Sequence, residues 1–193
     1  MTKPENILKF YLPLLLVFMT SCGPRAASTN FHDPEMDFAA VRTVAVLPFN
    51  NLTTDRLAAE RVRDTFTNGL LASGAVYVIP PGEVARGISR AGIIDPTSPS
   101  SEENARLASI IRVDAIITGV VREYGQVRSG TATADVLSVS AQMIETQTGK
   151  VVWAASATKG GISFIDRLFG SGGRPMNDIT RAAVDELLDK LFQ

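Results

Sequence analysis

The sequence predicts one α/β domain over residues 41–193, in which helices cover a single mixed sheet in a three-layer-like arrangement. Two observations carry this prediction. Short apolar runs rich in β-branched residues alternate with amphipathic segments in the first half, and two long runs of alternating polarity follow. The composition agrees, because 45% hydrophobic residues in a chain of 193 supply enough apolar side chains for a core. The expected order is β-α-β-α-α-β-β-β-α.

The first predicted strand is RTVAVLPF, residues 42–49, which ends next to a proline. A helix is expected over residues 55–73, because apolar side chains recur there at four-residue steps and Gly74 stands where a helix would stop. These side chains are Ala58, Val62, Phe66 and Leu70. AVYVI, residues 75–79, is the second strand, closed by two prolines.

Two further helices are expected before the third strand. Pro81 suits the first turn of a helix that ends at Gly92. Ser100 and Glu103 form the capping-box pattern at the start of the next helix, whose inward side chains would be Leu107, Ile110 and Ile111. The apolar run DAIITGVV, residues 114–121, is the third strand.

The second half predicts a hairpin and a final helix. Over residues 134–145 apolar and polar side chains alternate, which predicts a strand with one buried and one wet face. Gly149 can take a positive φ in the turn, and residues 151–159 return as the partner strand, with Trp153 as a core anchor. The closing helix covers residues 176–192. Its apolar face is Ile179, Ala183, Leu187 and Leu191, and its solvated carboxylates are Asp178, Asp185, Glu186 and Asp189.

Composition also bounds the function. Lys and Arg number 19 and Asp and Glu 20, a net charge of -1, and the two signs interleave, so we expect no nucleic-acid partner. The single cysteine, Cys22, excludes an internal disulfide framework and a cysteine-rich zinc site. The single histidine, His32, falls in a segment that is expected to be an exposed tether.

Residues 1–21 have the three zones of a secretion signal, namely basic residues, the apolar run FYLPLLLVFM and small residues before Cys22. The apolar run is about half of the ~20 residues that span a bilayer as a helix. The ending MTSC resembles the lipobox of bacterial lipoproteins, apart from Met19, where leucine is usual. The resemblance implies cleavage between Ser21 and Cys22, and attachment to a membrane through a diacylglyceryl or acyl lipid, such as palmitate, on Cys22.

Gly23 follows the cysteine, at the position where aspartate retains lipoproteins in the inner membrane of well-studied Gram-negative families. The resemblance therefore implies a lipid anchor in the outer membrane, with the domain on the periplasmic face. Two or three acyl chains hold a protein far more firmly than a single myristoyl chain. Residues 22–40 are expected to be the lipidated cysteine and a flexible tether, because they are rich in small, polar and breaking residues.

Four stretches together resemble the CsgG-type lipoproteins, over residues 41–192. They are VAVLPFNNLT, YVIPPGEVARGI, RVDAIITGVVREYG and ETQTGKVVWAASATKGGISFIDRLFG. The resemblance implies a fold shared with LpoB, with the N-terminal domain of TolB and with anticodon-binding domains. Channel-forming members carry two added membrane-spanning hairpins, whose strands need roughly 9–11 residues each. Residues 122–133 are too short and polar for such a hairpin, and residues 160–175 are too short and glycine-rich, so we expect a short relative without a pore.

No residue spacing predicts catalysis. With Cys22 lipidated and His32 in the tether, neither is left as a nucleophile, base or soft metal ligand. GSGGRP, residues 170–175, lacks the Lys-Ser/Thr of a phosphate-binding loop and is interpreted as a flexible loop. We therefore expect no catalytic residues, no metal and no cofactor.

One apolar segment between glycine-rich flanks is a candidate protein interface. Its apolar side chains are Ile162, Phe164, Ile165, Leu168 and Phe169. The sequence leaves open whether they instead pack as core beneath the last helix. The two long strands of the second half also offer a sheet edge that a neighbouring subunit could extend.

These observations predict a non-enzymatic scaffold or accessory subunit in cell-envelope assembly or export. Its expected partners are other envelope proteins and further copies of itself. One alternative is an LpoB-like activator of a peptidoglycan synthase, which a short tether disfavours, since residues 23–40 extend over only about 60 Å at ~3.5 Å per residue. The other is a periplasmic hydrolase or ligand-binding protein, which would need a deep pocket lined by Asp, Arg and Ser.

Overall fold

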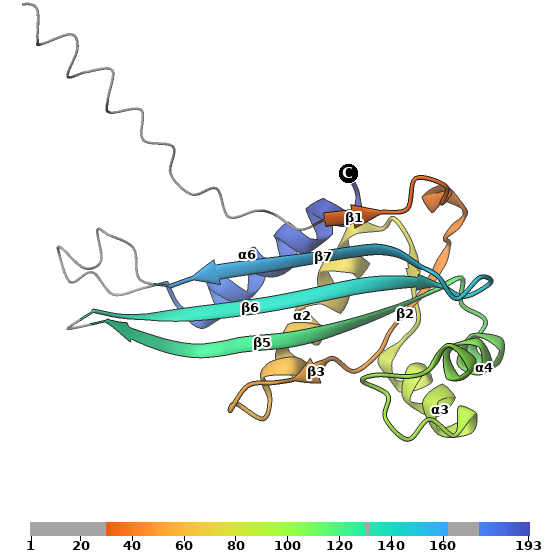
Figure 1. Cartoon of the computed structure of the whole chain (residues 1–193), viewed down its shortest axis with the longest axis horizontal. Coiled ribbons are helices and arrows are strands. Elements are labelled where there is room, and N and C mark those ends of the chain that lie inside the picture. Colours follow the sequence, from red (N-terminus) through yellow and green to blue (C-terminus); the bar gives the residue numbers. More distant parts are fainter. Residues whose placement is uncertain (1–29, 130–131, 162–173) are drawn as a thin grey trace, which may run out of the picture.

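The strands and helices in Figure 1 belong to a computed structural model that describes residues 30–129, 132–161 and 174–193. Within these residues the chain forms a mixed α/β domain with one seven-stranded sheet and four α-helices, which confirms the predicted fold class. The strands are β1 (Asn30–His32), β2 (Thr43–Val46), β3 (Asn50–Asn51), β4 (Tyr77–Val78), β5 (Ala115–Ser129), β6 (Ala132–Glu145) and β7 (Val151–Gly160). The helices are α2 (Ala58–Ser73), α3 (Pro81–Ala91), α4 (Ser101–Ile111) and α6 (Met176–Leu191), with a 3-10 turn, η1 (Phe38–Ala40), before β2.

The strands are arranged in the order β1-β7-β6-β5-β2-β4, with β3 beside β5. β2 pairs in parallel with β4 and β5, and β3 also runs parallel to β5. The connections between these strands contain α2, α3 and α4, since parallel neighbours need a crossover. β5, β6 and β7 are antiparallel, and β1 runs antiparallel along the outer edge of β7.

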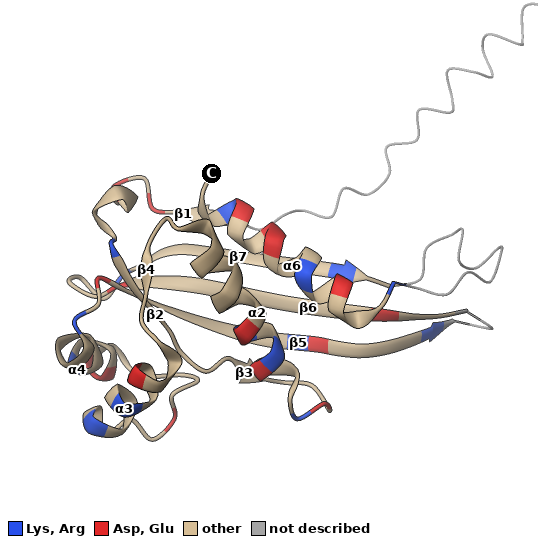
Figure 2. Ribbon diagram, turned by 180° about the vertical axis from the view of Figure 1, so that it is seen from behind, with Lys and Arg blue, Asp and Glu red and all other residues tan. Residues whose placement is uncertain are grey.

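Helices lie on both faces of the sheet but cover them unequally. α2 and α6 pack on one face, whereas α3 and α4 lie against the other face at its β2 end, as Figure 1 and Figure 2 show. β2 lies between the two layers, because Val44 and Val46 belong to the α2/α6 core and Ala45 and Leu47 to the α3/α4 core. A strand buried on both faces needs apolar side chains at every position, which explains the unbroken run VAVL.

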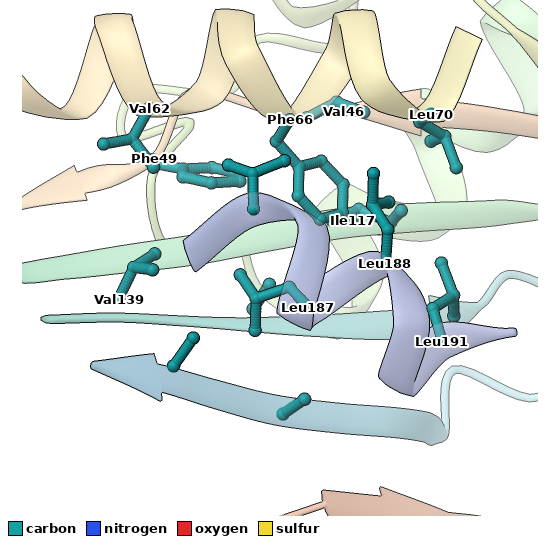
Figure 3. Packing of buried hydrophobic residues seen from close by; sticks show 14 of the residues in the cluster. Val46, Phe49, Val62, Phe66, Leu70, Ile117, Val139, Leu187, Leu188 and Leu191 are labelled. Carbon is teal, nitrogen blue, oxygen red and sulfur yellow. The ribbon is translucent and has the colours of Figure 1, made fainter. Parts of the chain in front are cut away.

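The larger core lies between the sheet and the helices α2 and α6, and Figure 3 shows part of it. Phe66 and Leu70 of α2 share this cluster with Leu187 and Leu188 of α6 and with Ile117 of β5. The predicted apolar faces of α2 and α6 are confirmed, since none of their side chains is more than 6% exposed. Trp153 is completely buried in the same core.

Local signals set the helix ends as predicted. Gly74 and Gly92 end α2 and α3 in the left-handed conformation, with φ of 63° and 66°. The Ser100 hydroxyl accepts a hydrogen bond from the Glu103 backbone N–H, and the Glu103 carboxylate accepts one from the Ser100 N–H, so the capping box forms. α4 differs in one respect, because Ile110 is 37% exposed instead of facing inward.

The prediction that residues 22–40 form a flexible tether is wrong for residues 30–40, which belong to the folded domain. β1 pairs with β7, with Phe31 opposite Ala154. His32 is half-buried instead of exposed, because its ring lies edge-on to Phe38, with ring centroids 5.3 Å apart, and its Nε2 is 3.5 Å from the Leu191 carbonyl oxygen. A three-residue strand has no readable period, and its partner is distant in the sequence, so local pattern could not reveal it. Asn30 already belongs to the domain.

Residues 122–133, expected as a polar connection, are largely strand. β5 continues to Ser129 and β6 begins at Ala132, in an antiparallel register that pairs Gly125 with Val136 and Arg128 with Thr133. Backbone pairing continues along this far part of the hairpin, and such pairing does not require an alternating apolar pattern of side chains. Figure 1 shows it projecting at one end of the sheet.

Several predicted features lie outside the described residues. They are the signal segment over residues 1–21, the cleavage pair Ser21 and Cys22, the candidate interface (Ile162, Phe164, Ile165, Leu168 and Phe169) and most of the loop over residues 170–175. In the part of the chain that is described, no helix combines the length and apolar character that crossing a bilayer requires.

Candidate functional site

The face of β5, β6 and β7 that points away from α2 and α6 is the candidate functional site. Inward side chains of these strands, such as Val139 and Ala155, belong to the core, so the alternate side chains point to the other face. Of the strand residues in the second core, which underlies α3 and α4, only Ile116 comes from these three strands. We call this surface the uncovered face. It is formed by Val120, Ser138, Ser140, Gln142, Ala154, Ser156 and Thr158, with the buried Thr118 on the same side of the sheet.

Hydrogen bonds between strands order the polar side chains of the uncovered face. The Gln142 amide donates to the Thr118 hydroxyl at 3.1 Å, and these residues are direct neighbours across β5 and β6. The Thr158 and Ser138 hydroxyls are 3.2 Å apart across β6 and β7. Such cross-strand pairs stabilise a sheet surface and hold its side chains in fixed positions.

Arg122 adds a positive charge to this surface. Its Nη1 donates to the Ser140 hydroxyl at 2.7 Å, which lays the long side chain over the sheet. The register of β5 and β6 shifts between Val121 and Glu123, so Arg122 lies at a β-bulge. Bulges re-aim side chains, and this one directs a guanidinium group onto the uncovered face.

Two hollows on the uncovered face are neighbours, because Ser140 and Ala141 line both of them. The first, of about 210 Å³, lies beside the loop of residues 97–99, and the second, of about 360 Å³, lies beside Phe31 of β1. We call the two neighbouring hollows together the sheet groove. Its side chains are mostly small, so a partner backbone can approach the sheet closely.

The sheet groove offers hydrogen-bonding groups and one positive charge. Its lining presents hydroxyl and amide groups and the Arg122 guanidinium, and none of the described residues that line either hollow carries a carboxylate or an imidazole. General acid–base catalysis uses such titratable groups. Across residues 30–129, 132–161 and 174–193, no three His, Cys, Asp or Glu side chains are grouped so that they could hold a metal ion.

Asp114, directly before the first residue of β5, joins β5 to the start of β2. One of its carboxylate oxygens accepts hydrogen bonds from the backbone N–H groups of Arg42 and Thr43 and from the Thr43 hydroxyl, each at 2.9 Å. Burial raises the pKa of Asp114, but these hydrogen bonds outweigh burial and hold the pKa below its ordinary value. The carboxylate therefore joins the starts of two parallel strands, and its role is structural.

Glu186 forms the second charged connection, between α6 and β7. Its two carboxylate oxygens each lie 2.5 Å from a lysine Nζ, one of Lys159 and one of Lys190. The Lys190 side chain is only 8% exposed and also donates to the Ser156 carbonyl at 2.7 Å. Burial raises the pKa of Glu186, but the two lysines lower it by more, so the pKa lies below its ordinary value. The prediction that Glu186 lies on a solvated face is therefore wrong, because sequence spacing within α6 does not show that Lys159 lies beside it.

The fold defines a class, that of mixed α/β domains with a sheet that is open on part of one face. Residues 35–190 match the family described as GNA1162-like lipoproteins. The chain belongs to this family. The CsgG-type family that the motifs resemble is not supported by this match. No curated protein matches the chain.

Solved structures of similar fold come from bacteria. Lipoprotein GNA1162 from Neisseria meningitidis has 18% identity and a TM-score of 0.58, and the match covers 78% of this chain and 98% of that one. The PelC dodecamer from Paraburkholderia phytofirmans has 17% identity and a TM-score of 0.54, with 85% and 95% covered. The C-terminal domain of LpoB from Escherichia coli has 16% identity and covers 64% and 86%, with a TM-score of 0.48, too low to support an argument. At these identities the first two matches show the fold alone.

Proposed function

We propose that this protein is an outer-membrane lipoprotein whose domain faces the periplasm and acts as a non-enzymatic scaffold or accessory subunit in cell-envelope assembly or export. Membership of the GNA1162-like lipoprotein family carries the proposal. The motif MTSC supports it, because cleavage between Ser21 and Cys22 would make Cys22 the lipidated first residue of the mature chain. Gly23 after the cysteine supports the outer membrane as the destination.

The proposed role depends on protein contacts, and the sheet groove is the surface that we assign to them. The partner that binds in the sheet groove is a second copy of this chain. The PelC dodecamer supports self-assembly, since it is an oligomer built on a similar fold. Phe31, which is 48% exposed at the rim of the groove, supplies an aromatic side chain of the kind that anchors protein interfaces.

Metabolic labelling tests the anchor. The full-length chain is expressed in a Gram-negative host with a radioactive fatty acid, and the membranes are separated on a density gradient. We expect label on the protein and its recovery with the outer membrane, both lost in Cys22→Ala. An unlabelled, freely soluble wild-type protein would refute the anchor and the location.

Cross-linking in membranes tests self-assembly through the groove. Ala154→Arg introduces a long charged side chain into the groove, and Ala72→Arg introduces the same side chain on the exposed surface of α2 as the matched control. We expect oligomers from the wild type and from Ala72→Arg, and a several-fold loss from Ala154→Arg. Equal oligomer yields from the two variants would show that the sheet groove is not the interface. Recovery of monomer alone from the wild type would refute self-assembly.

A further inference from the structure

Three arginines meet at an open crevice between α3 and α4, on the layer opposite α2 and α6. Arg86 and Arg90 come from α3 and Arg112 from the C-terminal end of α4, and together they line a cavity of about 300 Å³. Figure 2 shows basic residues on α3. The cavity lies outside the sheet groove, so it is a separate site.

Close contact between the two helices brings these side chains together. Gly87 lies between the two arginines of α3, and a Cβ built on it would lie 2.4 Å from Cγ2 of Ile111 and 2.9 Å from Cδ1 of Leu107. α4 can therefore approach α3 only because residue 87 has no side chain. Arg86 and Arg90 are four residues apart and share one face of α3.

The positive charge of the crevice is only partly balanced. Arg86 lies 3.9 Å from the Glu83 carboxylate, a contact longer than a hydrogen bond. Among the described residues, the side chains of Arg90 and Arg112 form no ion pair, and all three arginines are exposed. Three arginines and one glutamate thus line the same cavity.

The backbone of Arg112 is a second, independent observation. Arg112 has φ 55° and ψ 64°, and it is the one described residue other than glycine with a positive φ. α2 and α3 use glycine in this left-handed position, at Gly74 and Gly92. A side chain here costs free energy that glycine would avoid, and such outliers concentrate at functional sites.

We propose that Arg86, Arg90 and Arg112 form a binding site for a phosphate-bearing ligand. The guanidinium group is planar and presents paired N–H donors that match the oxygens of a phosphate group. Three positive charges and the one negative charge of Glu83 leave a local excess of positive charge that suits a phosphate anion. A lipid headgroup and a soluble phosphate offer the same chemistry, so the experiment separates these two sources.

The test measures thermal stability of the full-length chain in a non-ionic detergent. One arm titrates inorganic phosphate against chloride at equal ionic strength, and the other adds phosphatidylglycerol or phosphatidylcholine to the micelles. A ligand that binds only the folded state raises the Tm in a saturable manner. Phosphate also stabilises proteins non-specifically, and this part is the same in all variants.

The variants are Arg86→Gln/Arg90→Gln, Arg112→Gly and the control Arg181→Gln, an exposed arginine of α6. We expect the wild type and Arg181→Gln to show the same saturable rise, and the site variants to lose it. Arg112→Gly separates binding from folding, because glycine relieves the left-handed backbone and should raise the basal Tm while it abolishes the rise.

If the rise in Tm saturates at a lower concentration of phosphatidylglycerol than of inorganic phosphate, the site binds a lipid headgroup. Saturation by inorganic phosphate alone assigns it to a soluble ligand. The proposal is overturned if neither ligand gives a saturable rise in the wild type, or if the site variants retain that rise in full.

Discussion

The indole Nε1 of Trp153 donates a hydrogen bond of 3.2 Å to the carbonyl oxygen of Lys190, which joins β7 to the last turn of α6. The same lysine reaches back through its side chain to the Ser156 carbonyl on β7. Backbone and side chain of one residue therefore bind the helix to the strand at two points, and these contacts can be tested separately.

Trp153→Phe keeps an aromatic ring in the core but removes the indole donor. The Lys190 carbonyl loses that bond in a buried place, so we expect the free energy of unfolding to fall by about 1–3 kcal/mol. Urea unfolding of the purified protein measures it. Phe192→Leu, at a side chain 48% exposed, is the control and should change stability by less than about 0.5 kcal/mol. Equal losses in both variants would contradict a role for the hydrogen bond.

Glu186→Gln removes the charge that Lys159 and Lys190 share. Lys190 is nearly buried, and breaking one side of a buried ion pair leaves an uncompensated charge, so we expect a loss of about 2 kcal/mol or more at neutral pH. Asp185→Asn, at an exposed carboxylate one position earlier, is the matched control and should have little effect. A loss of unfolding free energy no greater than that of the control would mean that water compensates the charge of the Lys190 ammonium group.

The pH dependence of the same variant follows from the depressed pKa of Glu186. A carboxylate whose pKa is lower in the folded state contributes stability that is fully present above its unfolded pKa, about 4.3, and is lost as the pH falls through the folded value. The difference in unfolding free energy between the wild type and Glu186→Gln should therefore be constant near pH 7 and shrink below about pH 4. Thermal unfolding from pH 3 to 8 measures this difference, and one that grows on acidification would contradict the assigned sign.

Gly87→Ala tests the contact between α3 and α4. The added methyl group would overlap Ile111 and Leu107, so we expect a loss of about 1–3 kcal/mol, although alanine favours helices. Gly82→Ala lies on the same helix with only the end of Arg86 within 4 Å, and it should be neutral or stabilising. Chemical denaturation compares the two variants, and equal stabilities would show that the helices adjust without cost.

Ser100→Ala removes the side-chain half of the capping box of α4. The Glu103 backbone N–H loses its partner, and we expect a loss of about 1 kcal/mol. Ser101→Ala changes the next residue, which is exposed and lies inside the helix, and it should leave stability nearly unchanged. The comparison uses the urea midpoints of both variants.

The sequence predicts those parts of the fold whose signals lie within a single helix or strand. α2 and α6 show their apolar faces at regular spacing, and Gly74 and Ser100 end or start helices through local backbone geometry. The sequence pattern does not reveal β1, because three residues carry no period, and it predicts an inward Ile110, which is exposed in the structure.

The candidate site was less accessible from sequence. Ser138, Ser140 and Gln142 were identified as a wet face, but that this face stays open depends on where α3 and α4 pack. The groove also depends on Phe31, which a distant pairing brings to its rim. The crevice of Arg86, Arg90 and Arg112 has the same origin, because no spacing along the chain links the last residue to the first two.

The position of β1 has a mechanical consequence. The chain that leads to residue 30 enters the domain at a strand joined to the sheet by only three residue pairs, whereas β5 and β6 are paired along almost their whole length. Tension applied through the N-terminal segment would load those three pairs first and detach β1 while the remaining sheet stays folded. Release of β1 would free the edge of β7 from Trp153 to Ala155, so pulling on the protein and exposing a new strand edge are coupled events.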